Sequence, residues 1–467
     1  MKSKVLLIFF VLLLQTNYSF AQEGKSAKSD ELIEKYITAF NGGEETMKTF
    51  LLENVSASSL KERPIEMRLN MYRQMHGDVK DLTLNKIVET SPSSVTALIS
   101  ASNDAWLLFT FLFESKTGNK IEGIRIEQTD PPDSSATAKM TEPEAVRTIA
   151  QFLDQQAKKD IFSGSIVIAK DGTILFKSAY GLANKEFKVR NRPGTKFNLG
   201  SINKIFTQIA IGQLFEQGKL SLSDLIIKFL PGYPNNAAAR KVTIRHLLDM
   251  TSGIGDFFGE KFENRPKDKF RTIGDFLGMF AGDSLKFEPG TERQYSNGGF
   301  IVLGAIIEKA SGQNYFDYVK DNIFKPAGML NTDSYEADIP VPNLAEGYTR
   351  DSSIKPWKRN IYTRPARGSS AGGGYSTAED LLKFTDALEK GVFFKDVDTW
   401  STLRGEPSGS NDRKQNGLGI YGGAPGINSG IESNIGRGYT AIVMANYDPP
   451  AAADAMKKIR GILKRVR

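Results

Sequence analysis

Two residues near the middle of the chain could act together as a nucleophile and its base. Ser201 and Lys204 stand at spacing i, i+3 in NLGSINK, directly before an apolar run that starts at Ile205. At this spacing the two side chains share one face at the start of a helix, where the dipole favours negative charge on the serine and disfavours the charged lysine. A lysine whose pKa is lowered by burial can then take the serine proton.

The motif S-x-x-K is weak evidence by itself, because it occurs three times in the chain. The other copies lie at 58–61, in a polar stretch, and at 352–355, in a segment followed by proline. A serine cap with an exposed lysine is the ordinary alternative for the Ser201 copy. That copy differs from the others in having Gly200 before it and a long apolar helix predicted after it.

A tyrosine in a second polar segment could exchange a proton with Ser201. The pattern Y-x-N occurs at Tyr295–Asn297, in a tight polar loop before an apolar helix, and again at 233–235, in a proline turn. We expect the phenol of Tyr295 to be acidified by a nearby lysine. Imidazole chemistry is not expected, because the chain has only two histidines and His246 lies in an apolar helical setting typical of a structural residue.

The composition narrows the chemistry further. The chain has no cysteine, which excludes disulfides, thiol nucleophiles and thiolate metal sites, and it has no HExxH motif. The formal net charge of +7 is a small excess for 467 residues. We therefore expect no metal, no organic cofactor and no nucleic-acid partner.

The N-terminal residues 1–21 have the pattern of a secretory signal peptide. Lys2 and Lys4 precede an apolar run at 5–14, and Ser19-Phe20-Ala21 offers small residues at the cleavage positions. The run is too short to span a bilayer, so we expect cleavage after Ala21 and no stable membrane insertion. The protein is then exported, either to the periplasm or to the medium.

The rest of the chain reads as two domains of α+β class. Residues 28–129 predict a small domain in which two or three helices precede an antiparallel sheet with strands at 82–89, 94–101, 105–113 and 121–128. Its order resembles the cone-shaped fold of the nuclear-transport-factor type. Residues 130–142, rich in Pro, Ser and Thr, predict a linker.

Residues 143–467 predict a larger domain that must position the candidate residues. A helix at 142–158 leads to a hairpin whose turn is Asp171-Gly172, and the chain returns to strand at 439–448 before a final helix. Strands at both ends, with helices and loops between them, predict one antiparallel sheet flanked by helices, with an inserted helical subdomain.

These segments resemble the serine hydrolases related to class C β-lactamases and penicillin-binding proteins. The resemblance spans roughly 145–467 and rests on GSIVIAKDGTILFKSAYGLAN, the Ser201 segment, VTIRHLLDMTSGI, PGTERQYSNGGFIVLG, AGGGYSTAEDLLKF and GGAPGINSG, in the family's order. It implies that Ser201 is acylated, with Lys204 as proton partner and Tyr295 as general base and acid. Asn297 would orient the substrate amide or the lysine, and the backbone N–H groups of Ser201 and Gly423 would form the oxyanion hole.

One position departs from the family's pattern. Where the family has Lys or His before the GGAPG turn, this chain has Ile420, which cannot hold a substrate carboxylate. The expected function is an exported serine hydrolase acting through an acyl-enzyme on an amide or ester, with cell-wall peptides and β-lactams among the candidate substrates. The alternative is a catalytically impaired binding or regulatory protein of the same fold. The sequence does not indicate an oligomeric state.

Overall fold

The computed structural model describes residues 26–91, 93–102, 105–114, 120–129, 139–351, 355–396, 398–405 and 417–467. Contacts divide the chain into two compact units, the first ending at Ala138 and the second beginning at Lys139. The predicted signal peptide and residues 130–138 of the predicted linker lie outside the described residues. Among the helices in the described ranges, none combines the length and apolar character that crossing a membrane requires.

The first unit is an α+β structure in which helices precede a four-stranded antiparallel sheet. Its elements are α1 (Ser26–Asn41), α2 (Glu44–Asn54), α3 (Ala57–Glu62), α4 (Ile65–Val79), β1 (Leu82–Ser91), β2 (Ser94–Ala101), β3 (Trp106–Phe113) and β4 (Ile121–Thr129). The strands pair in chain order and agree closely with the predicted runs. The described residues hold four helices rather than two or three, with Gly43 directly before α2 and Pro64 directly before α4.

The second unit begins and ends with a helix and is built around a five-stranded sheet. The strands of the whole unit, which also include short two-stranded pairs, are β5 (Gly164–Lys170), β6 (Thr173–Tyr180), β7 (Leu182–Asn184), β8 (Val189–Arg190), β9 (Phe197–Asn198), β10 (Tyr348–Thr349), β11 (Lys358–Arg359), β12 (Tyr375–Ser376), β13 (Gly419–Ala424), β14 (Ile427–Ile435) and β15 (Tyr439–Ala445).

The helices of this unit form two groups. Around the sheet lie α5 (Glu142–Lys158), the short turn η1 (Gly200–Ile202), α6 (Asn203–Glu216), α14 (Ala378–Glu389), α15 (Thr399–Leu403) and α16 (Ala451–Leu463). The inserted helical part holds α7 (Ile226–Phe229), α8 (Asn236–Ala239), α9 (Ile244–Leu248), α10 (Glu260–Glu263), η2 (Lys267–Lys269), α11 (Ile273–Leu277), α12 (Asn297–Ser311), α13 (Tyr315–Val319) and η3 (Lys320–Phe324).

The main sheet joins strands from both ends of the unit. Its order is β13-β14-β15-β5-β6, with every pair antiparallel, so the predicted sheet made from both ends of the region is confirmed. The turn between β5 and β6 has positive φ at both Asp171 (46°) and Gly172 (77°). Two such residues are what a type I′ hairpin turn requires, and this explains why an Asp-Gly pair stands there.

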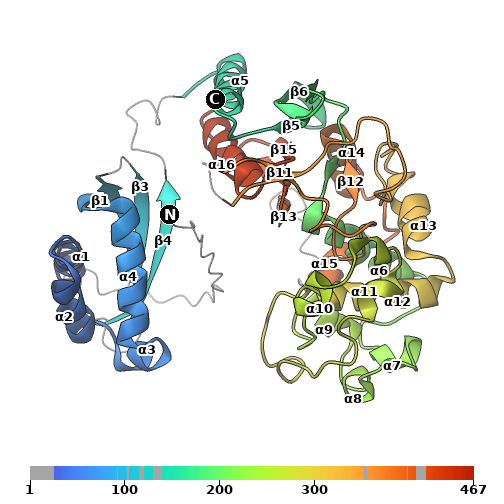
Figure 1. Ribbon diagram of the computed structural model, residues 1–467, viewed down its shortest axis with the longest axis horizontal. Helices are drawn as coiled ribbons and strands as arrows, with labels where there is room; N and C mark the ends of the chain where they lie inside the picture. The colour runs from blue at the N-terminus through green and yellow to red at the C-terminus, as the bar shows by residue number, and fades with distance from the viewer. Residues whose placement is uncertain are drawn as a thin grey trace. The chain divides into compact units, whose positions relative to one another are not determined.

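Alternating side chains of the sheet supply two separate cores. Ile166 and Ile168 of β5 face a core that also contains residues of α5 and α16. Val167 and Ala169 face the other side, where the larger core includes residues of α6 and α14. This period-2 pattern gives a three-layer arrangement, and the helices of the outer layer are those labelled α5 and α16 in Figure 1. The larger core continues into the inserted helical part, so the sheet and that part are packed as one body.

Candidate active site

The candidate nucleophile lies where β13, at the edge of the sheet, meets the start of α6. Ser201 is in the turn η1, and Lys204 is in the first turn of α6 with only 7% of its surface exposed. Lys204 Nζ lies 3.2 Å from Ser201 Oγ. Burial lowers the pKa of Lys204 to about 7, while the negative charge of Asp256 acts in the opposite direction. A large part of the Lys204 population is therefore neutral near neutral pH.

Lys204 has two strong acceptors besides the serine. Its Nζ donates to Asn297 Oδ1 and to the backbone oxygen of Ala371, both at 2.6 Å. A neutral amine has two N–H donors and one lone pair. If both N–H groups go to these oxygens, the lone pair remains for the hydroxyl proton of Ser201. The geometry therefore suits a lysine that acts as a base on the serine.

Tyr295 is brought to the same serine, as the sequence predicted. Its hydroxyl donates to Ser201 Oγ at 2.7 Å, and Lys204 Nζ lies 4.8 Å from the centroid of its ring. The expected acidification of the phenol is wrong, because the pKa of Tyr295 is raised. The ring is 53% exposed, but desolvation is the largest effect on the group, and the charge of Asp256 adds to it. Tyr295 is thus a protonated donor at neutral pH.

Asn297 is held from behind by a carboxylate that the sequence analysis missed. Asp256 Oδ2 accepts from Asn297 Nδ2 at 2.6 Å and from its backbone N–H at 3.3 Å. Since the amide nitrogen is occupied by Asp256, the amide oxygen faces Lys204. The available signal was the acidic residue in SGIGDF, directly after one of the segments that carry the family resemblance.

The backbone of Gly422 and Gly423 on β13 runs close to the turn that carries Ser201. A Cβ built on Gly200 would lie 2.8 Å from the backbone nitrogen of Gly423, and one on Gly422 would lie 2.8 Å from that of Ser201. These contacts bring β13 directly against the Ser201 turn. The φ of Gly200 is also +51°, which favours glycine. The structure therefore places Gly423 beside Ser201, where the sequence analysis expected it.

Ile420, the residue that departs from the family's pattern, also lies in apolar surroundings. Ile420, on β13, is half-buried and packs against the larger core. The next residue, Tyr421, turns its hydroxyl to Glu432. A cation for a substrate carboxylate is thus not supplied from this part of the strand.

Ser201 opens into a cavity of about 500 Å³ whose lining includes several aromatic side chains. Its aromatic and cationic members are Phe257, Phe258, Phe276, Tyr295, Tyr335, Arg364 and Tyr375. The sequence analysis missed Arg364 and Tyr335, which come from irregular segments without a recognisable pattern. A pocket of this size and character suits a small organic ligand.

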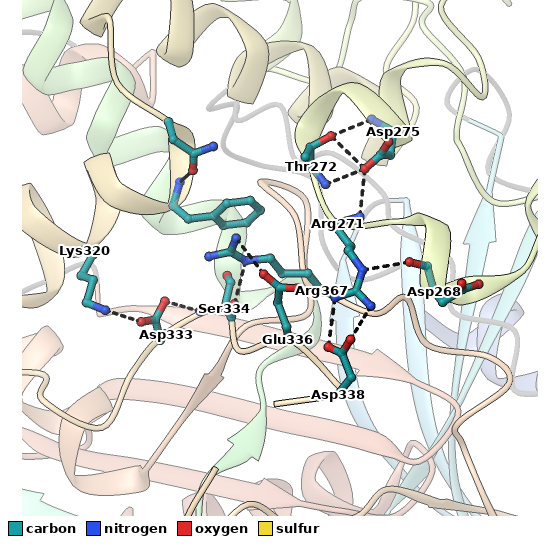
Figure 2. Close-up of polar contacts among 12 residues, drawn as sticks. Asp268, Arg271, Thr272, Asp275, Lys320, Asp333, Ser334, Glu336, Asp338 and Arg367 are labelled. Carbon is teal, nitrogen blue, oxygen red and sulfur yellow. Dashed lines mark hydrogen bonds and ion pairs between the residues drawn. The ribbon is translucent and has the colours of Figure 1, made fainter. Parts of the chain in front are cut away.

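A charged network holds the loop that carries Tyr335. Arg271 Nη1 and Nη2 donate to the two carboxylate oxygens of Asp338 at 3.0 and 2.6 Å, and Arg271 also contacts Glu336 (Figure 2). Arg367 reaches the same loop by donating to the Ser334 backbone oxygen at 2.9 Å. The loop 333–338 is therefore tied both to the helical part and to the segment that follows Arg364.

The remaining copies of the sequence motifs lie elsewhere. Ser58 belongs to α3 of the first unit, and Ser352 lies outside the described residues. His246 accepts a hydrogen bond from the backbone N–H of Thr243 through Nδ1, a capping role that agrees with the structural interpretation. In the described ranges, no group of three or more His, Cys, Asp or Glu side chains is arranged to hold a metal ion.

Comparison with known proteins gives a consistent result. The sequence profile of the β-lactamase family matches residues 146–463. Penicillin-binding protein 4* of Bacillus subtilis (strain 168) is 34% identical over 250 residues, which are 50% of this chain and 54% of that protein. The chain thus spans about half the length of this relative.

Solved structures with the same fold extend the likeness. A penicillin-binding protein from Bacillus halodurans superposes with a TM-score of 0.59 and 31% identity, covering 66% of this chain and 99% of the other. D-amino acid amidase from Ochrobactrum anthropi SV3 has a TM-score of 0.55 and 21% identity, covering 69% and 98%, a likeness of fold alone. The α+β fold class predicted for this region is confirmed.

Proposed function

The chain belongs to the β-lactamase family, and from that premise we propose that it is an exported serine hydrolase that cleaves an amide or ester through an acyl-enzyme. The observation that carries the proposal is the hydrogen-bonded group of Ser201, Lys204 and Tyr295, of which Ser201 and Tyr295 line the cavity. Export rests on the signal-peptide pattern of residues 1–21.

The first half-reaction forms the acyl-enzyme. Neutral Lys204 takes the hydroxyl proton of Ser201, whose Oγ attacks the carbonyl carbon of the substrate. The negative charge that develops on the carbonyl oxygen is stabilised by the backbone N–H groups of Ser201 and Gly423. Tyr295 gives its proton to the leaving group as the bond to it breaks, and the protonated Lys204 then restores the phenol.

The second half-reaction uses the same groups with water in place of the leaving group. Neutral Lys204 takes a proton from the attacking water, the new oxyanion occupies the same hole, and the ester bond to Ser201 Oγ breaks. The proton returns to Ser201, so the enzyme ends in its starting state. Because Tyr295 stays protonated at neutral pH, we assign the role of first base to Lys204.

Ile420 is the observation that favours a second candidate, a catalytically impaired binding or regulatory protein. Loss of the family's cation at this position removes a ligand for substrate carboxylates. The proton-transfer groups are nevertheless in contact with one another, and a neutral ester or amide needs no cation at Ile420. For this reason we prefer the hydrolase.

The experiment that tests the proposal is intact-protein mass after exposure to a fluorophosphonate and, separately, to a penicillin, with Ser201→Ala alongside. We expect one fluorophosphonate adduct that is absent in Ser201→Ala. The same adduct in the mutant would refute Ser201 as nucleophile. No adduct with either probe, in a protein shown to be folded by circular dichroism, would favour the binding protein.

A further inference from the structure

Arg364 is a cation in the cavity wall that the mechanism above does not use. It is half-buried and lines the same cavity as Ser201. Its Nη1 donates to the hydroxyl of Tyr375 at 3.0 Å, and among the described residues it forms no ion pair with a carboxylate. A guanidinium has five N–H donors, so most of its capacity is directed neither to Tyr375 nor to an acidic side chain.

A half-buried guanidinium that lines a cavity and has no carboxylate partner among the described residues is available to an anionic ligand. Arginine binds carboxylates with two parallel hydrogen bonds. The ring centroids of Tyr335 and Tyr375 lie 6.3 Å apart, and Tyr375 is the residue that accepts from Arg364. The wall thus offers an apolar surface together with a carboxylate-binding group.

The position of this wall indicates which part of a substrate it meets. In the proposed acylation, the carbonyl oxygen lies at the Gly423 N–H and the leaving group lies next to its proton donor, Tyr295. Tyr375 pairs instead with Asn198 on β9, whose Oδ1 accepts from the N–H of Gly200. By exclusion, the acyl group is the part of the substrate left to contact the Arg364 wall.

From these contacts we propose that Arg364 binds an anionic group on the acyl part of the substrate. The substrate class is an ester or amide whose acyl group carries an apolar or aromatic portion and a carboxylate. This inference rests on the proposed hydrolase function.

The test compares matched 4-nitrophenyl esters. One has a (4-carboxyphenyl)acetyl group, and the other carries the methyl ester of that carboxylate. A third, 3-carboxy-4-nitrophenyl phenylacetate, carries the charge on the leaving group. The values of kcat/KM are measured for the wild type, Arg364→Gln, Arg364→Lys and Arg240→Gln, the last removing an exposed cation that does not line the cavity.

We expect the wild type to prefer the acyl carboxylate over its methyl ester by about ten- to a hundredfold, the range for a hydrogen bond to a charged group. Arg364→Gln should remove that preference and leave kcat/KM for the methyl ester within about twofold of the wild-type value. Arg364→Lys should keep part of the preference, and Arg240→Gln should keep all of it. An equal fall for both esters in Arg364→Gln, no preference in the wild type, or a preference only for the leaving-group carboxylate would overturn the proposal.

Fluorophosphonate labelling of Ser201 separates this result from failure of the hydrolase function, because that probe carries no carboxylate. If Ser201 proves unreactive, equilibrium binding of 4-carboxyphenylacetamide and its methyl ester to the same variants replaces turnover. Tighter binding of the carboxylate, lost in Arg364→Gln, would then support the role of Arg364 in anion binding without support for hydrolysis. Equal binding of the two amides would refute that role.

Discussion

The carboxylate of Asp256 lies 2.6 Å from the side-chain nitrogen of Asn297, and this contact decides which end of the amide faces Lys204. With the nitrogen held by Asp256, the oxygen accepts from Lys204 Nζ. Asp256 is therefore linked to Ser201 through Asn297 and Lys204. It is a positioning residue and also the charge that holds the pKa of Lys204 up against the effect of burial.

Replacing Asp256 by Asn should shift the pH dependence of the reaction. Loss of the negative charge lowers the pKa of Lys204, so the neutral base persists to lower pH and the acid limb of kcat/KM moves down. The value on the plateau should fall by about ten- to a hundredfold, because the Asn297 amide is no longer held in one orientation. The measurement is kcat/KM for a neutral ester against pH. Asp283→Asn, which removes an exposed carboxylate, is the control, and a fall in rate with an unmoved acid limb would contradict the pKa effect.

Lys204→Arg should abolish turnover while keeping a positive group in place. A guanidinium stays protonated at all accessible pH values, so it cannot accept the Ser201 proton. We expect kcat/KM to fall by about two to four orders of magnitude. In the wild type, kcat/KM for a neutral ester should rise as the pH passes through about 7, where Lys204 becomes neutral. An enzyme that retained a large part of its activity with arginine at this position would rule out Lys204 as the base.

Tyr295→Phe should affect poor leaving groups most. The variant keeps the ring beside Lys204 and loses only the hydroxyl that lies 2.7 Å from Ser201 Oγ. A leaving group of high pKa needs the phenol proton, whereas 4-nitrophenolate leaves without much help. Rates for 4-nitrophenyl and ethyl esters of one acid, measured in both enzymes, test this. Equal losses for the two esters would mean that Tyr295 does not protonate the leaving group.

A pair of glycines on β13 provides a test of the oxyanion hole. A Cβ on Gly422 would lie 2.0 Å from the backbone oxygen of Leu199, so Gly422→Ala must push the strand away from Ser201. Gly419 lies on the same strand, and its Cβ would meet nothing within 4 Å. We expect Gly422→Ala to lose about two to three orders of magnitude in kcat and Gly419→Ala to stay near wild type. Similar activities in the two variants would exclude a role for this close approach.

Much of the site could be predicted because its residues lie in short segments whose local sequence pattern is recognisable. Ser201 and Lys204 are related by helical spacing. Asn297 is the first residue of a second apolar helix, α12, and Tyr295 lies just before it. The contact between these two segments is a tertiary contact. It was expected only because the segments occur in the order found in a known family. The sheet, too, follows from local features, such as the Asp171-Gly172 turn and the apolar runs on either side of it.

What could not be predicted depends on packing between distant segments. Arg364 and Asp256 stand in irregular loops, where no periodicity indicates the direction of a side chain. The direction of the Tyr295 pKa shift was predicted wrongly because burial is invisible in the sequence, and here burial is the largest influence on the phenol. The similarity of the first unit to the nuclear-transport-factor type remains a prediction.

The pairing of β5 with β15 has a consequence for how the second unit is made. Ile166 lies opposite Val443, so the central pair of the sheet closes a very long loop, and β13 and β14 assemble beside β15. Pairings at such large sequence separation form slowly. During synthesis the ribosome releases Ser201, Lys204 and Tyr295 well before residues 419–445 exist. A partly made chain would hold the nucleophile without Gly423, so hydrolytic competence should appear late and all at once.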